Sequence, residues 1–139
     1  MISIIGEMRD LVNGALADRV PCFVGTASKD GRPQISIKGS VLVYDDETLA
    51  FWERAKRTAL KNINENPRTV VFYRNPQQRN NWRFHGTATV HESGAIRDAV
   101  MERTIQQEMD RDPDRDGVAV LVKIDLIDEL SGNVLQRRD

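Results

Sequence analysis

The sequence contains only one cysteine, Cys22, and no long apolar run. A single cysteine excludes an intramolecular disulfide, and its place in the short apolar segment "VPCFVGTA" indicates a buried core residue. No segment approaches the ~20 apolar residues that a membrane-spanning helix requires. The first ten residues, "MISIIGEMRD", turn acidic too early for a signal peptide. We therefore expect a reduced, cytoplasmic setting and no membrane partner.

The sequence also lacks an excess of either positive or negative charge. Lys and Arg total 20 and Asp and Glu total 21, so the formal net charge is −1. General nucleic-acid binders are usually basic overall, so this balance argues against a nucleic-acid partner. With 139 residues, of which 40% are hydrophobic, the chain is expected to form a single domain over residues 1–139. Arginine outnumbers lysine by 15 to 5, which favours bidentate binding of carboxylates or phosphates.

Several catalytic and metal-binding motifs are absent. The glycines form neither a dinucleotide fingerprint nor a phosphate loop, and no serine lies in a nucleophile elbow. The two histidines, His85 and His91, lie six residues apart on a predicted strand, roughly 20 Å at strand rise, and cannot ligate one metal. The segment "DPDRDG" begins like a calcium loop, but Lys123 occupies the position of the bidentate glutamate. We predict no metal site and interpret both histidines as surface residues, with His85 alternatively at the edge of a ligand site.

Hydrophobic periodicity predicts a mainly β domain of the α+β class. Amphipathic helices are expected over 4–18 and 95–109, and a short helix follows "TLAFWE" and ends before Pro67. Asp30-Gly31, between two strand-like runs, predicts a hairpin. Hairpin-linked strands predict an antiparallel sheet of six to seven strands, curled into a barrel and flanked by helices. The expected strands cover residues 20–27, 33–45 (as one strand or two), 48–53, 68–74, 82–91 and 117–130.

Alternation is clearest in two of these strands. In the first, one face is expected to carry Trp82, Phe84, Gly86, Ala88 and Val90. In the second, one face is expected to carry Val118, Val120, Val122, Ile124 and Leu126. These faces should form the barrel interior.

The start of the short helix, in "ERAKRTALKN", is rich in cations. A helix N-terminus carries a partial positive charge, so cations there are mildly unfavourable unless an anion binds. Unpaired helix N–H groups, the Lys56 and Arg57 charges and the Thr58 hydroxyl together suit a phosphate. A solvated basic face is the alternative interpretation. Aromatic and polar residues of neighbouring strands are expected to converge on the same place, namely Phe51, Trp52, Lys38 and Ser40.

An ordered set of motifs resembles a known family. The "DGRP" hairpin, the "TLAFWERAKRTALKNINENP" strand–helix unit and the "WRFHGTATV" strand follow one another as in the pyridoxamine 5'-phosphate oxidase-like flavoproteins. The resemblance covers about residues 20 to 92. It implies an FMN-binding split β-barrel that works as a homodimer. The cations at the helix start would then bind the phosphate of FMN.

The resemblance also implies site residues. Arg57 and Thr58 correspond to the Ser-Arg pair that binds the phosphate in the family, whereas Ala59 replaces the lysine that commonly follows. Arg54, Lys56 or Lys61 are the candidates to substitute for that lysine. The resemblance also implies Lys38 near the phosphate, Phe51, Trp52 and Glu53 along the ring and ribityl chain, and Asn81 beside the flavin of the partner chain. Two further cofactor-binding residues are expected from their positions, namely Ser40 in the facing strand and Trp82, which follows a polar loop and could reach the flavin of a partner.

Three classes of function follow. The first is an FMN-dependent oxidoreductase with an unknown small substrate or NAD(P)H, whose catalytic residues the sequence does not identify. The second is a flavin carrier or sensor without turnover. The third, less favoured, is a nucleic-acid module that uses the basic and aromatic patch around Trp52 and Trp82. A homodimer with flavin at its interface is expected, because "VLVYD" and "VVFY" are apolar on both faces.

Overall fold

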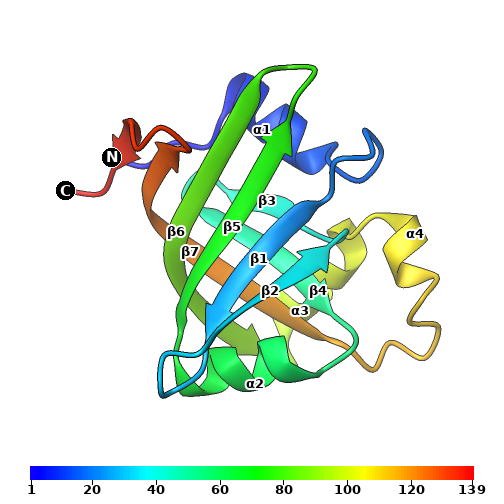
Figure 1. Ribbon diagram of the computed structural model, residues 1–139. Helices are drawn as coiled ribbons and strands as arrows, with labels where there is room; N and C mark the ends of the chain where they lie inside the picture. The colour runs from blue at the N-terminus through cyan, green and yellow to red at the C-terminus, as the bar shows by residue number, and fades with distance from the viewer.

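The computed structural model describes all residues from 1 to 139 as eight strands and four helices. The expected mainly β architecture with flanking helices is confirmed (Figure 1). No helix has both the length and the apolar character needed to cross a bilayer. Along the chain the elements are α1 (Gly6–Asn13), β1 (Cys22–Ala27), β2 (Pro33–Lys38), β3 (Leu42–Asp45), β4 (Thr48–Glu53), α2 (Thr58–Glu65), β5 (Arg68–Asn75), β6 (Asn80–His91), α3 (Ala95–Arg103), α4 (Gln106–Met109), β7 (Val118–Glu129) and β8 (Val134–Arg137).

The strands form one antiparallel, strongly curled sheet in the order β2-β1-β5-β6-β7-β4-β3, with β8 paired to β7 (Figure 1). The expected six to seven strands become eight, because the short segment 134–137 pairs with the far end of β7. Segment 33–45 forms two strands, β2 and β3. The Asp30-Gly31 hairpin is confirmed, since β1 and β2 pair and Gly31 takes the left-handed φ of 86° that such turns need.

The barrel interior holds the main hydrophobic cluster, to which both long strands contribute. β6 and β7 are in close contact at Gly86, where a Cβ atom would lie 2.2 Å from the Lys123 carbonyl oxygen. A register shift between β6 and β7 follows immediately, between His85 and Gly86. Leu126 therefore leaves the interior face expected for it and pairs with His85, while Ile127 is fully buried.

Two predicted helices are shorter than their periodicity suggested. The helix expected over 4–18 is regular only over α1, and its later residues form turns. The helix expected over 95–109 is broken into α3 and α4 at Thr104, which is extended (φ −70°, ψ 138°). The Thr104 hydroxyl donates to the Val100 carbonyl, so the side chain helps to end α3. α2 ends at Asn66 before Pro67, as expected.

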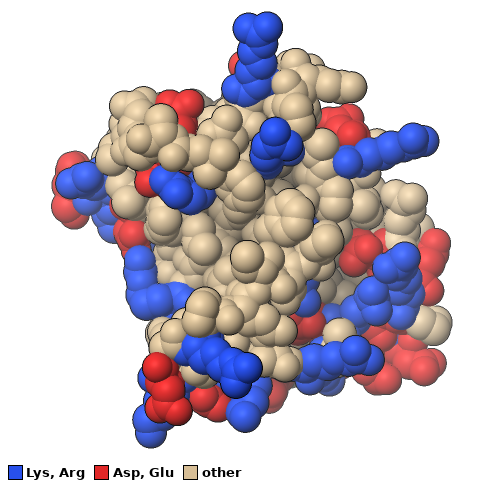
Figure 2. Space-filling view, in the orientation of Figure 1, with Lys and Arg blue, Asp and Glu red and all other residues tan.

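Helices cover only part of the sheet. α1 packs on β3, α3 packs on β4 and β7, and α2 lies across one end of the barrel, below β1 and β2 in Figure 1. Apart from α2 at its end, no helix lies over the side of β2, β1 and β5 that faces the viewer in Figure 1, where paired residues present one apolar surface. Figure 2 shows this surface as a broad area without charged side chains, bordered by charged residues. We call it the outer apolar face, and its members are Phe23, Ile35, Ile37, Val70 and Phe72.

Candidate functional site

The start of α2 has unsatisfied hydrogen-bond donors. The helix begins at Thr58, and no side chain caps it. Lys61 is the first residue whose N–H bonds back, to the Arg57 carbonyl, so the N–H groups of residues 58–60 have no protein partner. Helix ends in this state bind anions readily, because the free N–H groups and the helix dipole both favour negative charge. The structure therefore retains the feature that suggested a phosphate site.

The loop before α2 supplies unpaired positive charge. Arg54, Lys56 and Arg57 are exposed, and none of them forms an ion pair within the chain. Lys56 has a left-handed φ of 51°, which turns the backbone sharply one residue before the N-cap. Three unpaired cations thus lie in the four residues that directly precede α2, although the Arg54 side chain lines a separate groove with Glu108 and Asp110. Thr58, also exposed, is the hydroxyl residue at this end.

Lys38 is not free to join these cations. Its ammonium lies 2.7 Å from Oε1 of Glu53, whose side chain is 1% exposed. The contact is an ion pair without the directional geometry of a hydrogen bond. Oε2 of Glu53 accepts a hydrogen bond from the Lys56 N–H at 3.3 Å, which ties the basic loop to the end of β4. The pair therefore positions the loop, and the charge of Lys38 is already balanced.

Several other residues expected to touch flavin have buried side chains. Phe51 and Trp82 belong to the main core, and Trp82 stacks on Tyr73 with ring centroids 5.3 Å apart. Trp52 lies in a second cluster against α3 and α4. The Ser40 hydroxyl accepts from the Trp52 N–H and donates to its carbonyl. Their contacts with a cofactor stay a prediction, and within one chain these side chains serve packing.

Asn81 is the second residue of β6 and lies away from the start of α2. Its Oδ1 accepts the Leu130 N–H in the turn that links β7 to β8. Nothing within a single chain brings Asn81 to the basic loop. A flavin contact by this residue would therefore require a partner chain.

The segment "DPDRDG" serves a structural purpose. The buried Asp112 carboxylate accepts hydrogen bonds from Nε1 of Trp52 at 2.8 Å and from the backbone N–H groups of Asp116 and Gly117. Burial alone would raise the pKa of Asp112, but these hydrogen bonds and the nearby Arg115 hold the pKa below its usual value. Arg97 stacks on the other side of Trp52, 4.8 Å from the ring centroid. The loop is thereby fastened to the barrel.

A polar groove of about 540 Å³ adjoins α2. Its volume lies within the range of small-molecule and cofactor sites. Gln34, which lines this groove and a second one on the outer side of the sheet, has a buried side-chain oxygen without a hydrogen-bond partner. Sequence reasoning missed Arg32 and Gln34 as site residues, because only the β1–β2 hairpin brings them to α2. The lining residues are Ser28, Arg32, Pro33, Gln34, Thr58, Lys61, Asn62 and Glu65.

Solved structures share this fold. HupZ from Group A Streptococcus is 24% identical with a TM-score of 0.74, and the match covers 94% of this chain and 97% of that one. A pyridoxamine 5'-phosphate oxidase-related, FMN-binding protein from Nostoc punctiforme is 17% identical with a TM-score of 0.71, over 97% and 93% of the two chains. An FMN-binding protein from Syntrophomonas wolfei is 14% identical with a TM-score of 0.69, over 94% and 89%. At these identities the similarity concerns the fold.

The family is shown by a separate comparison. No curated protein matches the chain. The family model described as pyridoxamine 5'-phosphate oxidase, however, matches residues 7–128, which is most of the chain. The split-barrel fold of the related structures agrees with it, and so does the order of motifs in the sequence. The chain belongs to the pyridoxamine 5'-phosphate oxidase family.

Proposed function

We propose that this protein is an FMN-binding flavoprotein that acts as an oxidoreductase on a small molecule in the cytoplasm. The observation that carries the proposal is the open start of α2, where free N–H groups and the exposed Thr58 directly follow the unpaired cations Lys56 and Arg57. A phosphate monoester is the natural ligand of such an arrangement. Family membership makes FMN the phosphate-bearing group to expect.

The residues present fit this cofactor. Arg57 and Thr58 would hold the phosphate together with the N–H groups of the first helical turn, and Lys61 in the adjoining groove would take the place of the missing lysine at Ala59. When bound, FMN supplies a ring that accepts and donates hydride or single electrons. The chain itself supplies binding, orientation and exclusion of water.

The proposed working form is a homodimer with the flavin at the interface. Ile35 and Ile37 on the outer apolar face are 73% and 63% exposed, although both side chains are large and apolar. Exposed apolar surfaces of this kind usually mark interaction sites. A second copy laid on this face would cover it and would deepen the grooves at its edge into enclosed pockets.

A flavin carrier without turnover is the second candidate. It needs only the binding of flavin, for which the open start of α2 would suffice. A nucleic-acid module has less support, because Trp52 and Trp82 are buried and have no free ring face on which bases could stack.

Purification distinguishes these functions. A flavoprotein is expected to carry bound flavin, visible as the yellow absorption of the oxidised ring, and mass spectrometry of the released cofactor should give FMN. Anaerobic addition of NADPH or NADH should bleach this absorption if the protein turns over. A bound flavin that neither nucleotide bleaches would favour the carrier. A colourless protein that also fails to bind added FMN would overturn both.

A further inference from the structure

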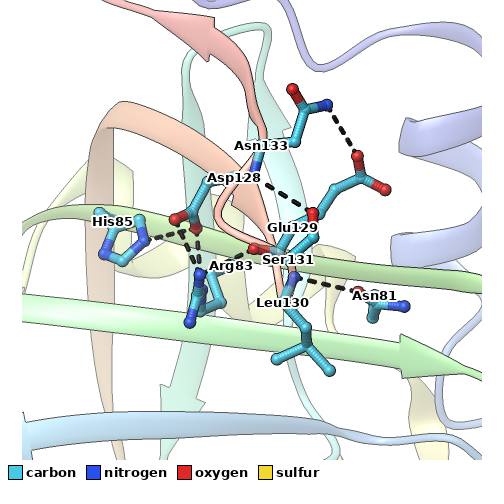
Figure 3. Close-up of polar contacts among 8 residues, drawn as sticks. All are labelled: Asn81, Arg83, His85, Asp128, Glu129, Leu130, Ser131 and Asn133. Carbon is cyan, nitrogen blue, oxygen red and sulfur yellow. Dashed lines mark hydrogen bonds and ion pairs between the residues drawn. The ribbon is translucent and has the colours of Figure 1, made fainter.

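A polar cluster lies beside the outer apolar face. Arg83 and His85 are alternate residues of β6, and Asp128 lies opposite Arg83 on β7. Arg83 binds the Asp128 carboxylate in bidentate fashion, with both N···O distances at 2.9 Å, and Nε2 of His85 lies 2.8 Å from Oδ1 of the same carboxylate (Figure 3). Arg83 also donates to the Glu129 carbonyl at 2.7 Å. One carboxylate thus fixes both neighbouring side chains.

These contacts determine which nitrogen of His85 carries hydrogen. Burial would raise the pKa of Asp128, but hydrogen bonds from Arg83 and His85 hold the pKa below its usual value, so the carboxylate is ionised near neutral pH. An ionised carboxylate only accepts hydrogen bonds, so Nε2 of His85 must be the donor. In the neutral ring Nδ1 is then an acceptor, and it has no partner within the chain. The cluster therefore presents one fixed acceptor.

His85 lines a shallow groove of about 390 Å³ on the outer side of the sheet. The groove is mostly apolar, with contributions from Ala27, Ile35 and Val70. Gly25 leaves its floor flat, since a Cβ atom there would lie 2.7 Å from Cγ1 of Val70.

The groove contains no unbalanced charge. Arg68 is the only charged residue of its lining apart from the imidazole, and it is paired with Asp125 at 2.8 Å. The groove thus suits a flat, uncharged ligand, and His85 is the acceptor at its edge.

We propose that this groove is the substrate site and that it takes a flat, largely apolar, uncharged molecule whose O–H or N–H donates to Nδ1 of His85. Asp128 and Arg83 are positioning residues that hold the imidazole in the accepting tautomer. The inference rests on the proposed function, because a flavin at the edge of the outer apolar face would meet its substrate there, under the second copy. It adds the chemical class of the substrate and the residue that selects it.

The tautomer is tested first, on the full chain without added ligand. The chain has only two histidines, so long-range nitrogen–proton correlation spectra resolve both rings, and His91→Phe assigns them. The proposal expects the neutral form of the His85 ring to carry its hydrogen on Nε2. A ring protonated on Nδ1 alone would overturn it. This measurement does not depend on flavin, so its outcome is separate from that of the proposed function.

Selectivity is tested with 2-naphthol and its methyl ether, which share a flat apolar ring system but differ in the O–H donor. In NMR titrations the wild type should bind 2-naphthol up to about tenfold more tightly, as one net hydrogen bond allows, and the His85 ring signals should move. His85→Phe should remove this preference, whereas His91→Phe should keep it. Equal binding of both probes by the wild type, or a preference that survives in His85→Phe, would overturn the proposal. If His85→Phe does not fold, the wild-type comparison and the shift of the His85 signals decide.

Discussion

The ammonium of Lys38 lies 2.7 Å from the carboxylate of Glu53, at the point where β4 ends and the basic loop begins. Glu53 is 1% exposed and Lys38 is 14% exposed, so the two charges are shielded from water together. A buried charge that loses its only partner is strongly destabilising, because its desolvation is no longer offset. Removal of one member is therefore expected to destabilise the fold by more than the intact pair stabilises it.

Lys38→Met is expected to lower the free energy of unfolding by about 3 kcal/mol, because it leaves the Glu53 carboxylate buried without a countercharge. Urea unfolding followed by circular dichroism measures this change. Lys29→Met, at an exposed lysine of the β1–β2 hairpin, is the matched control and should be near wild type. The double variant Lys38→Met with Glu53→Gln should recover part of the loss. Equal stability of the two lysine variants would contradict the account.

Asp112 is expected to contribute stability that depends on pH. Its pKa in the folded state lies below the ordinary 3.8, so the folded form binds a proton less readily than the unfolded form. The contribution is therefore complete above that ordinary value and is lost as the pH falls through the lower folded pKa. Asp112→Asn should cost about 1–3 kcal/mol at neutral pH, because an amide cannot accept all three hydrogen bonds.

The same substitution should flatten the acid dependence. Unfolding free energies measured from neutral pH to about pH 3 should fall less steeply for Asp112→Asn than for the wild type. Asp114→Asn, at an exposed carboxylate of the same loop, serves as the control and should keep the wild-type slope. Parallel curves for wild type and Asp112→Asn would show that this carboxylate does not hold the loop.

Gly86→Ala is expected to prevent or severely weaken folding. The added methyl group would lie 2.2 Å from the Lys123 carbonyl oxygen, and this neighbour is backbone that cannot move aside without separating β6 from β7. Gly31→Asn is the comparison, because Gly31 has open space around it and asparagine tolerates a positive φ. Thermal unfolding should place Gly31→Asn close to the wild type. A well-folded Gly86→Ala with a similar Tm would refute the close contact.

The outer apolar face is expected to hold two copies together. Sedimentation equilibrium should give twice the 15.8 kDa of the chain at micromolar concentration. Ile37→Lys should shift the mass toward the monomer with little effect on folding, because the side chain is 63% exposed in one chain. Ile5→Lys, at another exposed isoleucine outside this face, should leave the mass unchanged. A monomeric wild type with bound flavin would exclude the shared site.

Local sequence patterns predicted most of the fold, and their failures have physical causes. Alternation in 82–91 and the Asp30-Gly31 turn depend on neighbouring residues alone, so both were predictable. The register shift that moves Leu126 out of the core depends on the contact between β6 and β7 at Gly86. The local sequence pattern of one strand does not predict such a contact. β8 exists only because β7 extends far enough to pair with it.

The candidate site was predictable only in part. The basic residues at the start of α2 are consecutive in the sequence, and the helix begins where it was expected. Lys38 pairs with Glu53, and Trp52 donates a hydrogen bond to Asp112. Both contacts join residues that are distant in sequence. The sequence alone therefore could not show that these side chains have partners within the chain. The acceptor nitrogen of His85 likewise depends on Asp128, which lies on another strand.

The most direct test of the central claim compares FMN with riboflavin, which lacks the phosphate. Fluorescence titration of the apoprotein should show that the wild type prefers FMN, and that Arg57→Ala with Thr58→Ala reduces this preference roughly tenfold or more while riboflavin binding changes little. Arg74→Ala, at an exposed arginine of β5, should keep the wild-type preference. A preference for FMN that is the same in the double variant and the wild type would show that the phosphate does not bind at the start of α2.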